Sequence, residues 1–139
     1  ALTELTSEYQ LLITSSNIDT KSSVYAKMFN KILKNNKNKV FYISNLGVRS
    51  YFSCLSHVVL VMGNSSSGII EVASFNKYVI NIGDRQKGRD SGENVQNVKF
   101  DKHEIINAVK KFAGLEFKGP NIYDRGGASK LIISKLKNL

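Results

Sequence analysis

Three serines and two glycines stand at the junction of two apolar segments, in the stretch GNSSSG at residues 63–68, called the serine loop below. The apolar run VVLVMG precedes it, and an apolar helical pattern follows it. Glycines let a backbone approach a ligand closely, and the free N–H groups of a helix's first turn attract anions. Ser65, Ser66 and Ser67 add hydroxyl donors. The pattern predicts a phosphate-binding loop, but a serine N-cap and a glycine turn without a ligand explain it equally well.

Other catalytic motifs fit this stretch poorly. A hydrolase elbow requires G-x-S-x-G, and here the second glycine comes one residue late. Gly63 and Gly68 have the spacing of a P-loop, but two isoleucines replace its lysine and hydroxyl residue. A dinucleotide fingerprint is absent from the first strand–helix turn, which argues against NAD. We expect His57 at the opposite end of the sheet from the serines and His103 in the first turn of a charged helix, so a Ser-His triad is not expected.

Charged residues near the serine loop suggest which phosphate compound would bind. Glu71 follows Gly68 by three residues, and its carboxylate could accept hydrogen bonds from the two hydroxyls of a ribose. The polar stretch at residues 84–94, called the basic loop below, carries Arg85, Lys87 and Arg89, which suit a diphosphate. The alternatives are a surface glutamate on a helix and a solvated basic loop.

The surrounding sequence alternates strand patterns with helical patterns. Strands are predicted at residues 9–16, 40–44, 58–63, 78–83 and 95–100, and helices at residues 19–35, 47–56, 67–76, 101–114 and 128–139. The third strand is apolar throughout, as in a strand covered on both faces, and the fifth is a short edge strand. Asp101 with Glu104 predicts a helix start, and Gly114 predicts its end. The alternation predicts an α/β fold with a parallel sheet, doubly wound and Rossmann-like.

Composition limits the class of protein. The 139 residues suffice for one domain, residues 1–139, with a core of its own. A net charge of +9 favours anionic partners such as nucleic acid, a lipid surface or phosphorylated small molecules, although solvated helix faces explain much of it. Cys54 is the only cysteine, so an internal disulfide and a cysteine-based zinc site are excluded, and a reducing, cytoplasmic setting is expected. We expect no signal peptide and no membrane segment.

Two long stretches, GNSSSGIIEVASF at residues 63–75 and VINIGDRQKGRDSGENV at residues 79–95, resemble the hydrolysing UDP-N-acetylglucosamine 2-epimerases. These enzymes make N-acetylmannosamine for sialic-acid-type sugars. SSNIDT at residues 15–20 resembles the family's Pro-Asn-x-Asp loop, with Ser16 in place of the proline. NIYDRGGASK at residues 121–130 resembles its Tyr-Gly-x-Gly-x-Ala segment, with Asp124 in place of a glycine. The non-hydrolysing epimerases differ, since they carry an Asp-Ser-Gly-Gly turn.

The resemblance implies one half of a glycosyltransferase-B type fold, namely the C-terminal, UDP-binding domain without its N-terminal Rossmann-like partner. In that family the catalytic acids belong to the N-terminal half, so no catalytic residue, metal site or cofactor is expected in this chain. The residues that the resemblance assigns to the UDP moiety are Asn17 in the pocket wall, Leu46 at the uracil, Ser65 and Ser66 at the diphosphate, Glu71 at the ribose, and Arg85 near the phosphates or the sugar.

The resemblance also implies an activity and partners. The reaction would convert UDP-N-acetylglucosamine and water to N-acetylmannosamine and UDP, with the isolated chain inactive. The expected partners are UDP, a UDP-sugar, the N-terminal half and possible further copies of the chain, but no nucleic acid and no membrane. Two alternatives stay open: the same family acting on UDP-2,4-diacetamido-2,4,6-trideoxyglucose, or a basic Rossmann-like module that binds nucleic acid. In the last helix, Leu131, Ile132 and Leu136 are expected to cover the domain's own sheet or a second copy.

Overall fold

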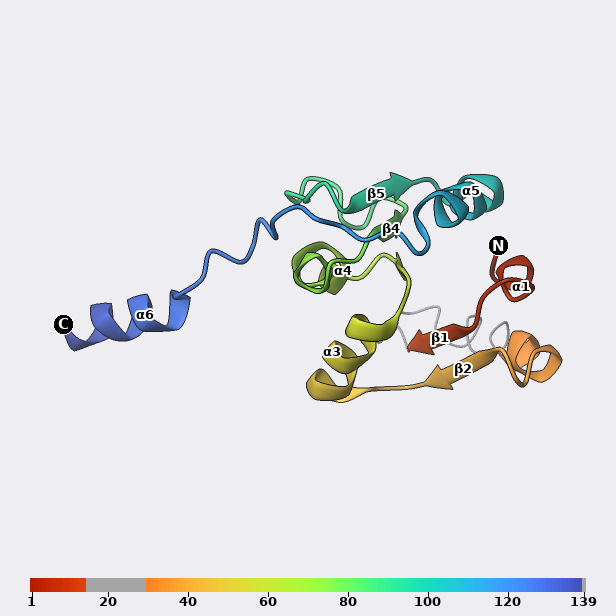
Figure 1. Cartoon of the computed structure of the whole chain (residues 1–139), viewed down its shortest axis with the longest axis horizontal. Coiled ribbons are helices and arrows are strands. Elements are labelled where there is room, and N and C mark those ends of the chain that lie inside the picture. Colours follow the sequence, from red (N-terminus) through yellow and green to blue (C-terminus); the bar gives the residue numbers. More distant parts are fainter. Residues whose placement is uncertain (15–29, 139) are drawn as a thin grey trace. The chain divides into compact units, whose positions relative to one another are not determined.

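The computed structural model describes residues 1–14 and 30–138 of the chain. They form two compact units, Ala1–Cys54 and Leu55–Leu139. In each unit every pair of neighbouring strands runs parallel, as the alternation of strands and helices predicted. The chain is therefore an α/β protein of the Rossmann-like, doubly wound type (Figure 1). Within these described ranges, no helix has both the length and the apolar character needed to cross a membrane.

The first unit holds a two-stranded parallel sheet. After α1 (Leu2–Leu5), β1 (Leu11–Thr14) pairs with β2 (Val40–Ile43) in register from Leu11 opposite Val40 to Thr14 opposite Ile43. Residues 30–35 are helical, in agreement with the prediction for that part of residues 19–35, and the earlier part lies outside the described residues. α3 (Gly47–His57) follows β2 and continues into the second unit.

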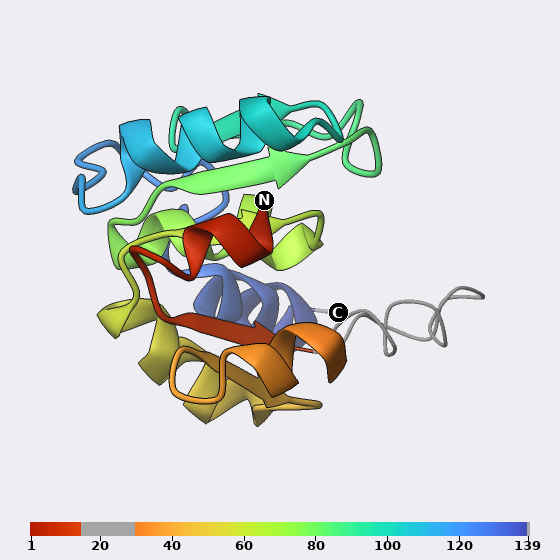
Figure 2. The ribbon, with the colours of Figure 1, turned by 90° about the vertical axis from the view of Figure 1, so that its right-hand side faces the viewer.

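The second unit is built around β4 (Val79–Ile82), which pairs with β3 (Val61–Gly63) on one side and β5 (Val95–Val98) on the other. α4 (Ser66–Ile70) packs on β3 and β4, and α5 (Lys102–Phe112) packs on β4 and β5. Figures 1 and 2 both place β4 between α4 and α5. Successive side chains of a strand point to opposite faces, and helices cover both faces of β4. The first two residues of β4, Val79 and Ile80, are therefore both buried.

The helix α5 begins and ends where the sequence predicted. The Asp101 carboxylate accepts hydrogen bonds from the backbone N–H groups of His103 at 2.8 Å and Glu104 at 2.9 Å. The Glu104 carboxylate accepts from the N–H of Lys99 at 2.9 Å, two residues before the partner that a capping box would use. At the other end Gly114 adopts a φ of 80°, a left-handed conformation that terminates the helix.

Two predicted elements differ from the structure. The strand expected at residues 58–63 begins only at Val61, and Val59 is 50% exposed, because an apolar run does not by itself supply the neighbours that bury it. The helix expected at residues 67–76 is divided into α4 and a 3₁₀ helix, η1 (Val72–Phe75). Glu71 lies at the break with φ −109° and ψ −36°, and a distant segment, described below, forms hydrogen bonds to a backbone carbonyl before it and to a side-chain hydroxyl after it.

The C-terminal segment ends in α6 (Ala128–Lys137), the predicted last helix. None of its described residues is buried, and Leu131, Ile132 and Leu136 are 59–64% exposed, so they do not cover the sheet of their own unit. Asp124, which replaces the usual glycine of the family, does not have a positive φ. Its carboxylate instead accepts a hydrogen bond from the N–H of Gly126 at 3.1 Å and so supports the turn.

The cap of α5 predicts a pH dependence of stability. The pKa of Asp101 is held below its ordinary value of 3.8, chiefly by the hydrogen bond from the N–H of Glu104. Because the folded-state pKa is the lower one, the stabilisation is complete well above pH 3.8 and is lost as the pH falls through that value and then through the folded-state pKa. Thermal melts at a series of pH values should therefore show Asp101→Asn losing stability relative to the wild type at neutral pH but not at low pH. Asp90→Asn is the matched control, and a constant difference at every pH would contradict the prediction.

Candidate functional site

The serine loop lies where β3 ends and α4 begins. Gly63 ends the strand with a φ of 150°, a conformation that favours glycine. Ser65 caps α4, and its hydroxyl oxygen accepts a hydrogen bond from the N–H of Ser67 at 3.4 Å. Ser65 and Ser66 are exposed. Since α4 has only five residues, its dipole is small, and any anion here would be bound chiefly by the hydroxyls and the local N–H groups.

Glu71 is oriented by a neighbour in the same turn of chain. The hydroxyl of Ser67 donates a hydrogen bond to Oε2 of Glu71 at 2.5 Å, and both residues are half-buried. The third serine therefore serves the glutamate, whereas Ser65 and Ser66 present their hydroxyls to solvent. This contact goes beyond the roles predicted from the sequence, although the four-residue spacing of Ser67 and Glu71 on a helix is a signal for it. The fixed carboxylate can accept further hydrogen bonds from a ligand on its second oxygen.

The basic loop follows β4 at the same edge of the sheet, because β3 and β4 are parallel neighbours. It begins after Gly83, whose φ is 76°, and continues through tight turns closed by the N–H groups of Lys87 and Arg89. The side chains of Arg85, Lys87 and Arg89 are exposed. The loop thus presents three cations to solvent at the carboxyl end of the strands, where ligands bind in open α/β sheets.

The side chain of Gln86 connects the two loops. Nε2 of Gln86 donates a hydrogen bond to the backbone carbonyl of Asn64 at 2.8 Å, between residues 22 positions apart in the sequence. This contact joins the residue that follows Arg85 to the serine loop. No local pattern identifies Gln86 in advance, because its partner is a backbone atom of a distant turn. The predicted phosphate-binding residues Ser65, Ser66 and Arg85 therefore lie on two loops that are tied together.

The remaining predicted site residues lie elsewhere in the chain. Leu46 belongs to the first unit, half-buried at the start of α3, where the side-chain oxygen of Asn45 accepts from the N–H of Gly47 at 2.8 Å. Asn17 lies outside the described residues. The contribution of both residues to a site therefore stays a prediction.

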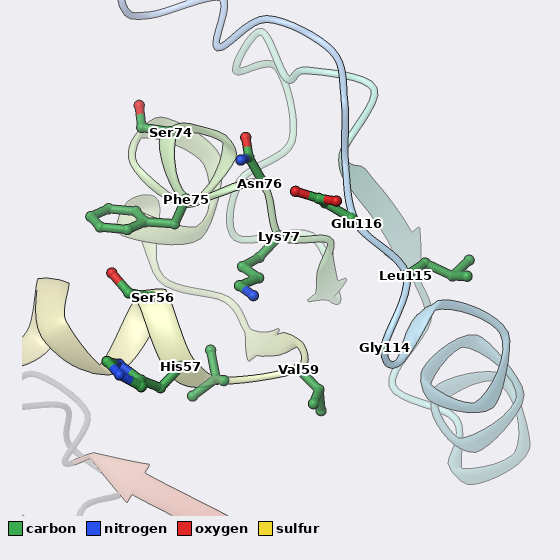
Figure 3. A pocket seen from close by; sticks show the side chains of 11 residues that line it. Ser56, His57, Val59, Ser74, Phe75, Asn76, Lys77, Gly114, Leu115 and Glu116 are labelled. Carbon is green, nitrogen blue, oxygen red and sulfur yellow. The ribbon is translucent and has the colours of Figure 1, made fainter.

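A cavity of about 570 Å³ occurs at the other end of the second unit's sheet. It is lined by the end of α3, by the residues that precede β3 and β4, and by the turn after α5, including His57, Lys77 and Glu116 (Figure 3). These residues lie at the amino ends of the strands, whereas the serine loop lies at the carboxyl ends. His57 is therefore at the opposite end of the sheet from the serines, as predicted, and the two do not form a nucleophile–base pair.

The fold and the tied loops define a Rossmann-like α/β protein with polar loops at the carboxyl edge of its sheet. Comparison with known proteins identifies the family: the family of UDP-N-acetylglucosamine 2-epimerases matches residues 1–137. The chain belongs to this family.

Individual relatives extend the comparison. The chain is 33% identical over 108 residues to the GDP/UDP-N,N'-diacetylbacillosamine 2-epimerase (hydrolyzing) of Campylobacter jejuni, covering 78% of this chain and 28% of that protein. It is 34% identical over 101 residues to the polysialic acid biosynthesis protein P7 of Escherichia coli, covering 73% of this chain and 25% of that protein. It is 29% identical over 136 residues to the UDP-N,N'-diacetylbacillosamine 2-epimerase (hydrolyzing) of Legionella pneumophila, covering 97% of this chain and 36% of that protein. The chain thus spans about a quarter to a third of the length of these relatives.

The tie between the loops can be tested without a ligand. Gln86→Glu replaces the amide donor with a carboxylate that cannot donate to the carbonyl of Asn64 at neutral pH. We expect faster amide hydrogen exchange in both the serine loop and the basic loop, with the exchange of α5 unchanged. Gln10→Glu, an exposed position in the other unit, is the control with the same change of charge. Unchanged exchange in both loops would show that the contact does not hold them.

Proposed function

We propose that this chain is the UDP-binding half of a hydrolysing UDP-sugar 2-epimerase. The observation that carries the proposal is the hydrogen bond from Gln86 to Asn64, which ties three exposed cations to the serine loop in a chain of this family. A loop of hydroxyl and N–H donors beside an arginine loop has the chemistry to bind a diphosphate. Because the chain covers only part of its relatives' length, the activity would belong to a longer protein.

Each predicted residue has a role in this proposal. Ser65 and Ser66 donate to the diphosphate from the exposed edge of the serine loop, and Arg85 neutralises its charge. The Glu71 carboxylate, held by Ser67, accepts hydrogen bonds from the ribose hydroxyls. The family resemblance assigns Asn17 to binding of the nucleotide sugar and the backbone of Leu46 to binding of the uracil. The exposed lysine and arginine side chains of the basic loop add a field that attracts the anion.

The proposed reaction begins with elimination of UDP from the sugar. The bond from C1 to the phosphate oxygen breaks, a proton leaves C2, and the electron pair of that C–H bond forms the C1–C2 double bond of a glycal. Water then adds, with hydroxide at C1 and a proton at C2 on the face opposite to the one deprotonated. The chain's part is to stabilise the charge that develops on departing UDP with fixed donors. The proton transfers require groups from the other half of the protein.

Two sugars fit the proposal. UDP-N-acetylglucosamine is the substrate that the family's description names. The relatives from C. jejuni and L. pneumophila are instead named for N,N'-diacetylbacillosamine, a 2,4-diacetamido-2,4,6-trideoxyglucose, which favours that sugar as the second candidate. We propose UDP-N-acetylglucosamine first, and a direct comparison of the two sugars in the full-length protein decides between them.

A titration with UDP is the direct test of the site. We expect a Kd on the order of 0.1–1 mM, about 4–5.5 kcal/mol, because a ligand of an interdomain cleft loses half of its walls in this chain. Hydrogen bonds between a charged group and its partner contribute about 1.5–3 kcal/mol, so Glu71→Ala and Ser66→Ala should each weaken binding about tenfold or more. Calorimetry or protein NMR measures the affinities, with CMP as the ligand control.

Matched variants separate a local effect from a general one. Glu116→Ala and Ser134→Ala remove the same groups at exposed positions away from the serine loop and should leave the affinity unchanged. Absence of UDP binding at about 5 mM, in both this chain and the full-length protein, would overturn the proposal. Binding of nucleic acid with a steep salt dependence and no preference for UDP would favour the basic nucleic-acid module instead.

The division of roles between two halves predicts that the isolated chain does not turn over substrate. Incubation of the chain with UDP-N-acetylglucosamine should release neither UDP nor N-acetylmannosamine above the uncatalysed rate, as followed by proton NMR. The diacetamido sugar nucleotide should behave in the same way. Enzymatic release of UDP by this chain alone would mean that its own residues supply the proton transfers, contrary to the proposal.

A further inference from the structure

Asn121 contacts the chain on both sides of Glu71, at a backbone carbonyl before it and a side-chain hydroxyl after it. Its Nδ2 donates to the carbonyl of Ile70 at 2.8 Å and lies 2.7 Å from the hydroxyl oxygen of Ser74. Ile70 is the last residue of α4, where a helix leaves carbonyl groups without intrahelical partners, and Ser74 lies in η1. Glu71 sits at the break between them, where no continuous helix fixes the backbone. Local backbone hydrogen bonds run from the N–H of Glu71 to the carbonyl of Ser67 at 2.9 Å and from the N–H of Ser74 to the carbonyl of Glu71 at 3.0 Å. Asn121, which is 51 positions from Ile70, adds hydrogen bonds from a distant segment to this break.

Tyr123 contacts the basic loop, which is the second part of the candidate site. Its hydroxyl donates to the backbone carbonyl of Asp90, in the basic loop, at 2.6 Å. Gln86 holds the near end of this loop to Asn64, so the loop is held at two points, Gln86 and Asp90. The side chains of Arg85, Lys87 and Arg89 project from the stretch beginning at Arg85 and ending at Asp90.

The two contacts are joined by a third. Oδ1 of Asn121 accepts a hydrogen bond from the N–H of Tyr123 at 2.9 Å, so the position of one residue restricts that of the other. The N–H of Asp124 also donates to the carbonyl of Asn121 at 3.1 Å, which closes the segment into a turn. A three-residue segment, Asn121–Tyr123, thus contacts the turn that carries Glu71 and the loop that carries Arg85.

We propose that Asn121 and Tyr123 are positioning residues: Asn121 sets the backbone that aims the Glu71 carboxylate, and Tyr123 sets the basic loop. The inference rests on the proposed function, because the two parts of the site would bind different parts of UDP. Asn121 would therefore govern recognition of the ribose hydroxyls, and Tyr123 would govern affinity for the diphosphate. Neither residue needs to touch the ligand for this.

The test compares UDP with 2′,3′-dideoxy-UDP, which lacks the hydroxyls that Glu71 would bind. The wild-type chain should prefer UDP by about tenfold, the value of one good hydrogen bond to a charged acceptor. In Asn121→Ala this preference should fall toward one, with the affinity for the dideoxy compound nearly unchanged. In Tyr123→Phe, which removes only the hydroxyl, both affinities should fall by a similar factor and the preference should remain. NMR titration of the whole chain with each ligand measures the six affinities, two for each of the three proteins.

Controls separate positioning from folding. Asn107→Ala, on the exposed face of α5, and Tyr9→Phe, in the first unit, should bind as the wild type does. If Asn121→Ala melts much earlier than the wild type, Asn121→Asp takes its place, because it keeps the acceptor for Tyr123 and loses only the donors. Equal losses of both ligands in the asparagine variant, or a preference equal to that of the wild type, would overturn the proposal.

A ligand-free measurement distinguishes failure of this inference from failure of the proposed function. Amide hydrogen exchange should rise at residues 70–74 in Asn121→Ala and at residues 84–91 in Tyr123→Phe, with no UDP present. If the wild type does not bind UDP but these changes occur, the contacts hold the loops and the proposed ligand is wrong. If UDP binds but the exchange in both segments is unchanged, the positioning role is wrong.

Discussion

The parallel pairing of β4 with β3 and β5 is the constraint on which the second unit depends. Parallel strands place their carboxyl ends at one edge of the sheet, so the parallel pairing alone brings the loops that follow β3 and β4 to the same edge. The central strand β4 can be buried only if helices cover both of its faces. The packing of α4 against it is close, since a Cβ on Gly68 of α4 would lie 3.0 Å from Cγ1 of Val79. This glycine therefore also allows α4 to approach β4.

The long motif shared with the epimerase family divides into residues with different tasks. Arg85 is exposed and available to a ligand, but Gln86 binds backbone. At the end of the basic loop, Asn94 is completely buried and donates to the carbonyl of Lys77 at 3.2 Å. A Cβ on Gly92 would lie 2.9 Å from the Oδ1 atom of Asn94, so the glycine lets this side chain keep its position without a shift. Gly92 and Asn94 thus stabilise the end of the basic loop, where the chain enters β5. The earlier residues 85–89 carry the exposed cations.

Polar side chains from distant segments satisfy the backbone of both loops. A neutral hydrogen bond contributes only about 0.5–1.5 kcal/mol to stability, so no single contact among Gln86, Asn121 and Tyr123 determines the fold. Their effect is on geometry, since Gln86 and Tyr123 restrict the basic loop between its ends and Asn121 restricts the break at Glu71. A site assembled in this way is restrained where these contacts are made and exposed elsewhere.

The sequence by itself determined the parallel α/β class, the order of strands and helices, the start of α5 at Asp101 and its end near Gly114. These features follow from periodicity, caps and glycine conformations, which depend on residues a few positions apart. Residue types and spacing also located the serine loop and the basic loop, and the family resemblance added the roles in UDP binding. Only the tertiary structure decided the break at Glu71, the late start of β3 and the contacts of Gln86, Asn121 and Tyr123. Those contacts join residues 22 to 51 positions apart, and their partners are mostly backbone carbonyls, which carry no signal in the sequence.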